Sequence, residues 1–119
     1  MSSSRRMDDP SAPDDVLVVF VAAPASAADG LARGLVDARV AACVSVWPGG
    51  RSIYRWKGAV HDDAEHLLVA KTTRARYAAL EAAVRAAHPY EVPEILALPA
   101  ARGLPEYLAW VAAETREVA

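Results

Sequence analysis

The sequence has 119 residues, of which 54% are hydrophobic, so it is long and apolar enough for one domain with a core of its own. Its net charge is −2, and residues 1–15 account for all of it with four aspartates and two arginines, so the rest carries equal numbers of acids and bases. Nucleic-acid and anionic-membrane surfaces need a local excess of Lys and Arg, which argues against both partners.

The single cysteine, Cys43, excludes an intrachain disulfide and a CxxC motif, which favours a reducing compartment and a cytoplasmic location. No apolar run approaches the roughly 20 residues that span a bilayer. The N-terminus lacks the apolar segment of a signal peptide. Residues 1–15 are polar, so we expect a disordered tail there and one domain over residues 16–119.

The chain then predicts a central strand and a helix. Residues 16–21 (VLVVFV) form a continuous apolar run, which is typical of a strand covered on both faces. A helix is expected from Pro24 to about Arg39. Its apolar positions recur at helical spacing: Ala28, Leu31, Leu35 and Ala38.

A hairpin is expected next. Residues 40–47 form an apolar strand, and residues 52–57 form the strand that returns. Pro48-Gly49-Gly50 has the composition of the turn between them. Tyr54 and Trp56 share one face of the returning strand, because successive side chains alternate.

The sequence does not define where the next strand begins. Residues 58–65 are polar and predict a loop or an irregular strand start. The apolar run 66–71 either extends the previous strand after a bulge or forms a separate strand. Thr72 or Thr73 is expected to cap a second helix, which must end near His88 because the residue before a proline disfavours helical backbone angles.

The last elements are a strand over residues 92–98 and a helix introduced by Gly103 and Pro105. The order of elements predicts an α+β fold, the ferredoxin-like split βαβ sandwich, with an extra C-terminal helix. Right-handed crossovers place both longer helices on one face of the sheet. One short helix cannot cover the other face, so we expect it to be buried against other copies of the chain.

The densest chemistry lies in residues 88–94, HPYEVPE. His88, Glu91 and Glu94 are candidate ligands of a divalent cation, because imidazole and carboxylate groups suit such ions. The alternative is structural, with His88 capping the helix and the two glutamates pairing with arginines at a subunit contact. In a straight strand Glu91 and Glu94 point to opposite faces, so a shared ion requires a bend.

Other groups with metal-ligand chemistry lack a known spacing. Cys43 lies in an apolar run, where a lone cysteine usually packs as a small hydrophobe. His61 and His66 flank three acidic residues, and a solvated loop is the simpler interpretation of that cluster. No catalytic residues are expected, because the sequence shows no triad-like pairing, no P-loop and no GxGxxG motif.

Five short motifs lie along about residues 16–115. They are A-A-C-V at 41–44, P-G-x-x-S-I-Y-x-W-x-G at 48–58, K-T at 71–72, H-P-Y-E-V-P-E-I at 88–95 and Y-L-x-W at 107–110. In their order and spacing they resemble the CutA family, the divalent-cation tolerance proteins. The resemblance implies a non-enzymatic homotrimer in the response to divalent metal ions, assembled in a way similar to the PII signalling proteins.

The resemblance also bears on metal binding. Copper-binding positions described for the family correspond here to Val21, Ala87 and His88, and only His88 retains a ligand type. We therefore expect copper(II) or another divalent cation to bind weakly near His88, and no tightly bound cofactor.

Two alternatives remain. The first is a PII-like signalling module that binds a small metabolite in a cleft between subunits, lined by Trp47, Tyr54, Trp56, Tyr90 and Trp110. These aromatic residues instead anchor the subunit interface in the competing interpretation, since interfaces are enriched in them. The second alternative is a hydrolase that uses His88, Glu91 and Glu94.

Overall fold

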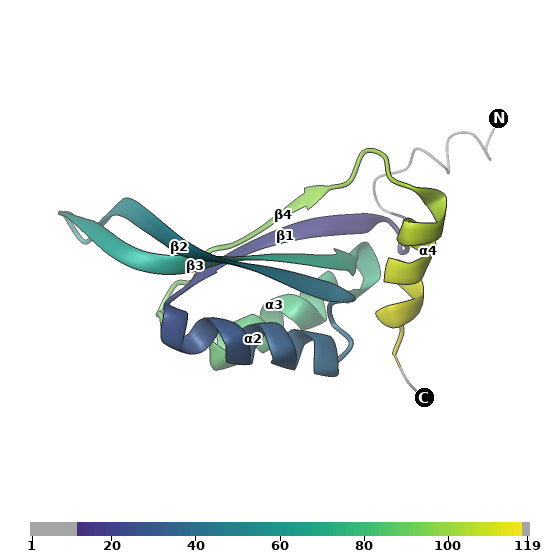
Figure 1. Cartoon of the computed structure of the whole chain (residues 1–119), viewed down its shortest axis with the longest axis horizontal. Helices are drawn as coiled ribbons and strands as arrows, with labels where there is room; N and C mark the ends of the chain where they lie inside the picture. Colours follow the sequence, from purple (N-terminus) through teal and green to yellow (C-terminus); the bar gives the residue numbers. More distant parts are fainter. Residues whose placement is uncertain (1–11, 118–119) are drawn as a thin grey trace.

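The computed structural model describes residues 12–117 and shows a four-stranded sheet with two helices on one face (Figure 1). The elements are β1 (Val16–Ala23), α2 (Ala25–Asp37), β2 (Cys43–Trp56), β3 (Ala59–Thr73), the short 3-10 helix η1 (Arg74–Arg76), α3 (Tyr77–Ala87), β4 (Ile95–Pro99) and α4 (Pro105–Glu114). The strand order is β2-β3-β1-β4, and every neighbouring pair is antiparallel. The predicted split βαβ fold and the central position of the first strand are confirmed. None of the helices in this part of the chain is long and apolar enough to cross a membrane.

The expected N-terminal tail is only partly described. Residues 1–11 lie outside the described residues. The backbone carbonyls of Pro13 and Asp15 accept hydrogen bonds from the amides of Ala75 and Arg74, at 3.0 and 2.9 Å. The Asp15 carboxylate also lies 3.8 Å from the Arg74 guanidinium, so the residues just before β1 are joined to η1.

One face of the sheet forms the core. Side chains of paired residues on neighbouring antiparallel strands share a face. On the helix-covered face the central positions have no exposed surface, namely Val19, Val21, Leu68 and Ala70. They pack against the apolar faces of α2 and α3, chiefly Leu31, Leu35, Leu80 and Val84. The spacing predicted for the first helix therefore identifies the core-facing side of α2 at Ala28, Leu31 and Leu35, whereas Ala38 follows the helix and is exposed.

The other face, which we call the uncovered face, is apolar and partly open. Phe20 pairs with Leu96, and Val18 pairs with Leu98, in the register of β1 and β4. Leu96 is 57% exposed and Leu98 is 48% exposed, so two leucines of the edge strand β4 leave a large part of their apolar surface open. A continuous apolar run in β1 was predicted to be covered on both faces, and within residues 12–117 only α4 lies against this second face, at one end.

α4 is attached to the end of the uncovered face by a small apolar contact. Val111 is fully buried and packs against Val16 and Ala42. Leu108 adds a partly buried contact to the same cluster. This cluster is separate from the main core under α2 and α3.

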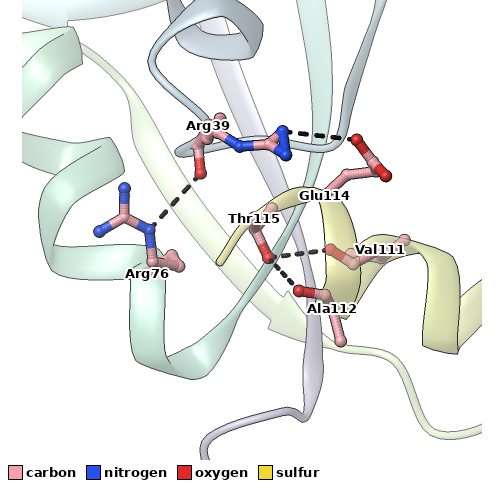
Figure 2. A network of polar contacts seen from close by, with 6 residues as sticks. All are labelled: Arg39, Arg76, Val111, Ala112, Glu114 and Thr115. Atoms are coloured by element: carbon pink, nitrogen blue, oxygen red, sulfur yellow. Dashed lines mark hydrogen bonds and ion pairs between the residues drawn. The ribbon is translucent and has the colours of Figure 1, made fainter. Parts of the chain in front are cut away.

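Polar contacts complete the attachment of α4 (Figure 2). The Arg39 guanidinium donates to the Glu114 carboxylate at 3.5 Å, and the Arg39 carbonyl accepts from the Arg76 guanidinium, also at 3.5 Å. The Thr115 hydroxyl donates to the Val111 carbonyl at 2.8 Å, which satisfies an unpaired acceptor at the end of the helix. The connection between α2 and β2 thus contacts both η1 and α4.

The hairpin of β2 and β3 turns at a different place from the one predicted. β2 continues through residues 48–50, and the chain reverses at Lys57 and Gly58, which have φ values of 50° and 81°. Of the two alternatives predicted for residues 58–65, a loop or an irregular strand start, the strand is confirmed, because residues 59–65 form the first half of β3. The apolar run 66–71 is therefore the second half of β3 and is separate from the strand that contains residues 52–57.

Pro48-Gly49-Gly50 forms a β-bulge instead of a turn. Trp47 pairs with Leu67, but the next pair is Gly50 with Glu65, so β2 has one residue more than β3 over this interval. Gly49 has a φ of 82°, in the left-handed region that favours glycine. A Cβ on Gly50 would lie 2.9 Å from the Glu65 carbonyl oxygen, so the strands approach too closely for any larger residue.

The bulge changes the faces on which the aromatic residues of β2 lie. Seven positions separate Trp47 from Tyr54, and strict alternation would place them on opposite faces. The extra residue shifts the alternation by one, so Tyr54 and Trp56 lie on the uncovered face together with Trp47.

Two further boundaries differ from the prediction. Neither Thr72 nor Thr73 caps the second helix, because β3 extends to Thr73 and the Thr72 hydroxyl donates to the Val40 carbonyl at 2.6 Å. β4 begins at Ile95, three residues later than expected, because Pro93 has no N–H for the ladder. The end of α3 at Ala87, just before His88, is confirmed.

We expect Gly50→Ala to lower the free energy of unfolding by about 1–3 kcal/mol, because the neighbouring atom is backbone and cannot move without disturbing the strand pairing. Urea unfolding at one fixed protein concentration measures the change. Gly30→Ala is the matched control: its Cβ would meet nothing within 4 Å in α2, so it should raise stability by about 0.5–1 kcal/mol. An unchanged midpoint for Gly50→Ala would contradict the close approach.

Candidate functional site

A pocket of about 590 Å³ lies between the hairpin and the segment that joins α3 to β4. We call it the aromatic pocket. It is lined by Ala22, Ser52, Tyr54, Trp56, Glu65 and residues 89–94. Its strand residues belong to the uncovered face, and its volume is typical of small-molecule sites.

The pocket contains three of the five aromatic residues expected to line a cleft. Tyr54, Trp56 and Tyr90 form its walls. Trp47 lies before the bulge, is 63% exposed and does not line the pocket. Trp110 belongs to α4, at the opposite end of the sheet from the hairpin tip, where its ring centroid is 5.7 Å from that of Tyr107 (Figure 1). Within one chain the five residues therefore do not form a single cleft.

Every charged residue that lines the pocket is acidic. These residues are Glu65, Glu91 and Glu94. Glu65 is only 6% exposed. Burial, and then the interaction of the phenol with the Glu65 carboxylate, raise the pKa of Tyr90 to about 12. The pocket therefore has a negative electrostatic character at its buried end.

Tyr54 is held in a similar way on the hairpin. Its phenol donates to the carboxylate of Asp63, and this hydrogen bond is the main reason that the pKa of Tyr54 is raised. The His61 ring stacks on Tyr54, with centroids 5.3 Å apart and planes 18° apart. A nearby carboxylate therefore contributes to the raised pKa of both tyrosines of the pocket.

His88 has a structural role in this geometry. It is 7% exposed, and its Nδ1 accepts a hydrogen bond from the backbone amide of Tyr90 at 3.1 Å. The other ring nitrogen, Nε2, lies 2.8 Å from the Ala22 carbonyl oxygen, which can only accept, so Nε2 carries the proton. His88 therefore ties the segment after α3 to the end of β1, and it orients Tyr90 in the pocket wall.

The three predicted metal ligands do not form a metal site within one chain. Both nitrogens of His88 are engaged in hydrogen bonds. Glu91 is exposed and pairs with Lys57 at 3.7 Å, and Glu94 is also exposed. Among residues 12–117 no group of three or more His, Cys, Asp or Glu side chains is placed to hold an ion. The side chains present do not fit a resident metal, and weak copper binding near His88 stays a prediction.

The other candidate ligands have packing roles. The Cys43 sulfur lies 3.5 Å from the Tyr107 hydroxyl. This hydrogen bond is the main reason that the pKa of Tyr107 is raised to about 12. His61 stacks on Tyr54, and the Nδ1 atom of His66 is buried without a hydrogen-bond partner in the described part of the chain.

Glu65 and Lys57 were not predicted as site residues. Glu65 was part of the polar stretch predicted as a loop or an irregular strand start. It follows Asp63 and His61 at strand spacing and precedes an apolar run. If residues 59–65 are interpreted as a strand, that spacing places Glu65 on the same face as Tyr54 and Trp56. Lys57 gave no such signal, because its position depends on where the hairpin turns.

Comparison with known proteins is consistent with the resemblance seen in the sequence. The family described as "CutA1 divalent ion tolerance protein" matches residues 16–114. The "Divalent-cation tolerance protein CutA" of Thermus thermophilus is 48% identical over 99 residues, which are 82% of this chain and 96% of that protein. The "Protein CutA 1, chloroplastic" of Oryza sativa is 42% identical over 117 residues, which are 98% of this chain but 66% of that protein.

Solved structures agree in fold. The Thermus thermophilus protein superposes with a TM-score of 0.82 at 47% identity, covering 85% of this chain and 99% of that one. The "PII-like protein CutA" of Nostoc sp. PCC 7120 superposes with a TM-score of 0.80 at 32% identity, covering 84% of this chain and 97% of that one.

We expect His88→Ala to lower the free energy of unfolding by about 1–3 kcal/mol, because it leaves the Ala22 carbonyl and the Tyr90 amide without partners. Urea unfolding measures this loss, and His61→Ala, which removes only a ring stacked on the surface, should cost less. A calorimetric copper(II) titration tests the predicted weak binding near His88: heat in the parent that disappears in a still-folded His88→Ala protein would place the ion there. Equal heat in both proteins, which the two hydrogen-bonded ring nitrogens favour, would place the ion elsewhere.

We expect Glu65→Gln to lower the pKa of Tyr90 from about 12 toward its ordinary value near 10, because a neutral amide no longer disfavours the phenolate. Because the folded chain holds the Tyr90 proton more tightly than the unfolded chain, Tyr90 contributes its full stabilisation at pH values below its ordinary pKa. This stabilisation is lost as the pH rises through the folded-state pKa of about 12. NMR of ring-labelled tyrosine in a Tyr107→Phe background measures the shift. Asp62→Asn, whose parent side chain pairs with Arg51, is the control and should leave Tyr90 unchanged.

Proposed function

Since the chain belongs to the CutA1 divalent ion tolerance family, we propose that it acts as a homotrimer in the response to divalent metal ions and catalyses no reaction. The main support for an assembly of several copies is the apolar character of the uncovered face. This face is apolar along β1 and β4, yet in a single chain its leucines remain about half exposed. Exposed apolar surface of this kind usually marks a site of association.

The charge distribution favours association of identical chains. Acids and bases balance over residues 16–119, so copies that approach through this face meet no net repulsion. An assembly of three copies is what the CutA resemblance implies for such a sheet.

The absence of catalysis is supported by the state of His88. A general base needs a ring nitrogen that is free to take a proton from a substrate. Both nitrogens of His88 are already hydrogen-bonded, and Glu91 and Glu94 lie on the exposed surface. The hydrolase hypothesis therefore has no base of the expected kind among these three residues.

We expect Leu96→Glu to convert the trimer to a monomer, because it places a charge in the middle of the buried interface without a partner. Light scattering at micromolar concentration measures the mass of the assembly. Val36→Glu is the matched control, because Val36 lies on α2 and is 40% exposed on the helical side of the molecule. A parent protein that is a folded monomer under these conditions would overturn the proposed assembly.

The metal response has its own test. Cells that lack this gene should become more sensitive to copper(II), and the parent gene should restore growth. A Leu96→Glu gene should restore it less well if the assembly carries the function. Equal sensitivity with and without the gene would remove copper from the proposal.

A PII-like signalling role is the second candidate, and the aromatic pocket favours it. The pocket has the size of a small-molecule site, and the related Nostoc protein is described as PII-like. A cytoplasmic location belongs to this proposal, although the rice relative is named for the chloroplast.

A further inference from the structure

We propose that the aromatic pocket binds a small organic cation through its ammonium group, between the rings of Trp56 and Tyr54 and the carboxylates of Glu65 and Glu91. This inference rests on the second candidate function proposed above, and it names the chemical class of the ligand.

The pocket combines the two features that recognise such ions. Aromatic faces attract cations through the ring quadrupole, and tryptophan does so most strongly. Three aromatic side chains line the pocket, and all its charged lining residues are acids. The carboxylate of Glu65 lies at the buried end of the pocket, and the Tyr54 phenol donates to the Asp63 carboxylate, which turns its proton away from the ring faces.

The chain itself places an ammonium group at this site. The Lys57 Nζ atom lies 5.7 Å from the centroid of the Trp56 ring and 3.7 Å from the Glu91 carboxylate. Both of these partners line the pocket, whereas Lys57 does not. The ammonium of Lys57 therefore marks the mouth of the pocket as a place where a cation is stabilised by a ring and a carboxylate together. Lys57 is 72% exposed and lies in the hairpin turn, so a ligand can displace it.

The same geometry disfavours other classes of ligand. A phosphate or carboxylate inside the pocket would be repelled by its three acidic lining residues, because Lys57 lies outside the lining. A metal ion needs several ligand atoms within about 2.0–2.6 Å of one point, and the described residues do not offer such a group. An organic cation is larger and needs no such convergence, because rings and carboxylates act on it over longer distances.

Choline chloride tests the proposal against its neutral isostere, in which a tert-butyl group replaces the trimethylammonium group. In isothermal titration of the full chain, choline should bind roughly tenfold or more tightly than the isostere. Equal affinity for the two, or no binding of either, would overturn the proposal.

Variants of the lining residues test whether choline binds in the aromatic pocket. Trp56→Leu and Glu65→Gln should each weaken choline binding roughly tenfold. Glu106→Gln, which removes the same charge from the first turn of α4, should leave it unchanged. Lys57→Met should strengthen choline binding several-fold, because it removes the resident ammonium without disturbing the core. A Lys57→Met protein that binds choline more weakly, or no effect of Trp56→Leu, would contradict the assigned site.

Light scattering of the same samples separates this inference from the proposed function. The parent protein could be a trimer that binds no choline but is stabilised by another small molecule, with that stabilisation lost in Trp56→Leu. This result would keep the pocket as a binding site and overturn only the proposal that its ligand is a cation. A monomeric parent protein overturns the proposed assembly, whatever choline does.

Discussion

The close passage of β2 across the Glu65 carbonyl is the constraint on which the rest of this hairpin depends. Only glycine fits at position 50, where a Cβ would lie 2.9 Å from that oxygen. The passage is part of a bulge that shifts the alternation of β2 by one residue. Tyr54 and Trp56 are thereby turned toward Glu65 and the segment after α3, so the aromatic pocket exists because of one extra backbone residue.

The alternation of side chains along β1 and β3 divides the molecule into two kinds of surface. One set of residues, which includes Val19 and Leu68, is fully buried under the helices and forms the core. The other set, which includes Phe20 and Glu65, forms the open apolar face together with Leu96 of β4 and also lines the pocket beside it. The pocket therefore lies next to the surface through which we propose that copies associate, and a ligand in it would lie close to a neighbouring subunit.

Much of the fold was predictable because its signals are local. The apolar run of β1, the helical spacing of Leu31 and Leu35, and the stop imposed by Pro89 all depend on neighbours in sequence. The turn was misplaced because Pro48-Gly49-Gly50 has the same composition in a turn and in a bulge. The choice between them is made by pairing with β3, a contact that sequence patterns of this kind do not encode.

The candidate site was predictable only in part. The aromatic residues Tyr54, Trp56 and Tyr90 were identified by type, and they do line one pocket. His88 was chosen for its ligand chemistry, but packing supplies both of its nitrogens with backbone partners. Burial and hydrogen-bond partners are properties of the folded chain, so residue type alone could not distinguish an anchoring histidine from a ligand.

The attachment of α4 has a consequence for local stability. In this helix the described chain buries only Val111 and Ala112 fully or nearly so, and the ion pair between Arg39 and Glu114 of this helix is 3.5 Å long. Segments with little buried apolar surface open at a lower free energy than the global fold. In the isolated chain α4 should therefore exchange its amide hydrogens with solvent sooner than β1 or β3, and each such opening uncovers Val16 and Ala42 while the main core stays closed.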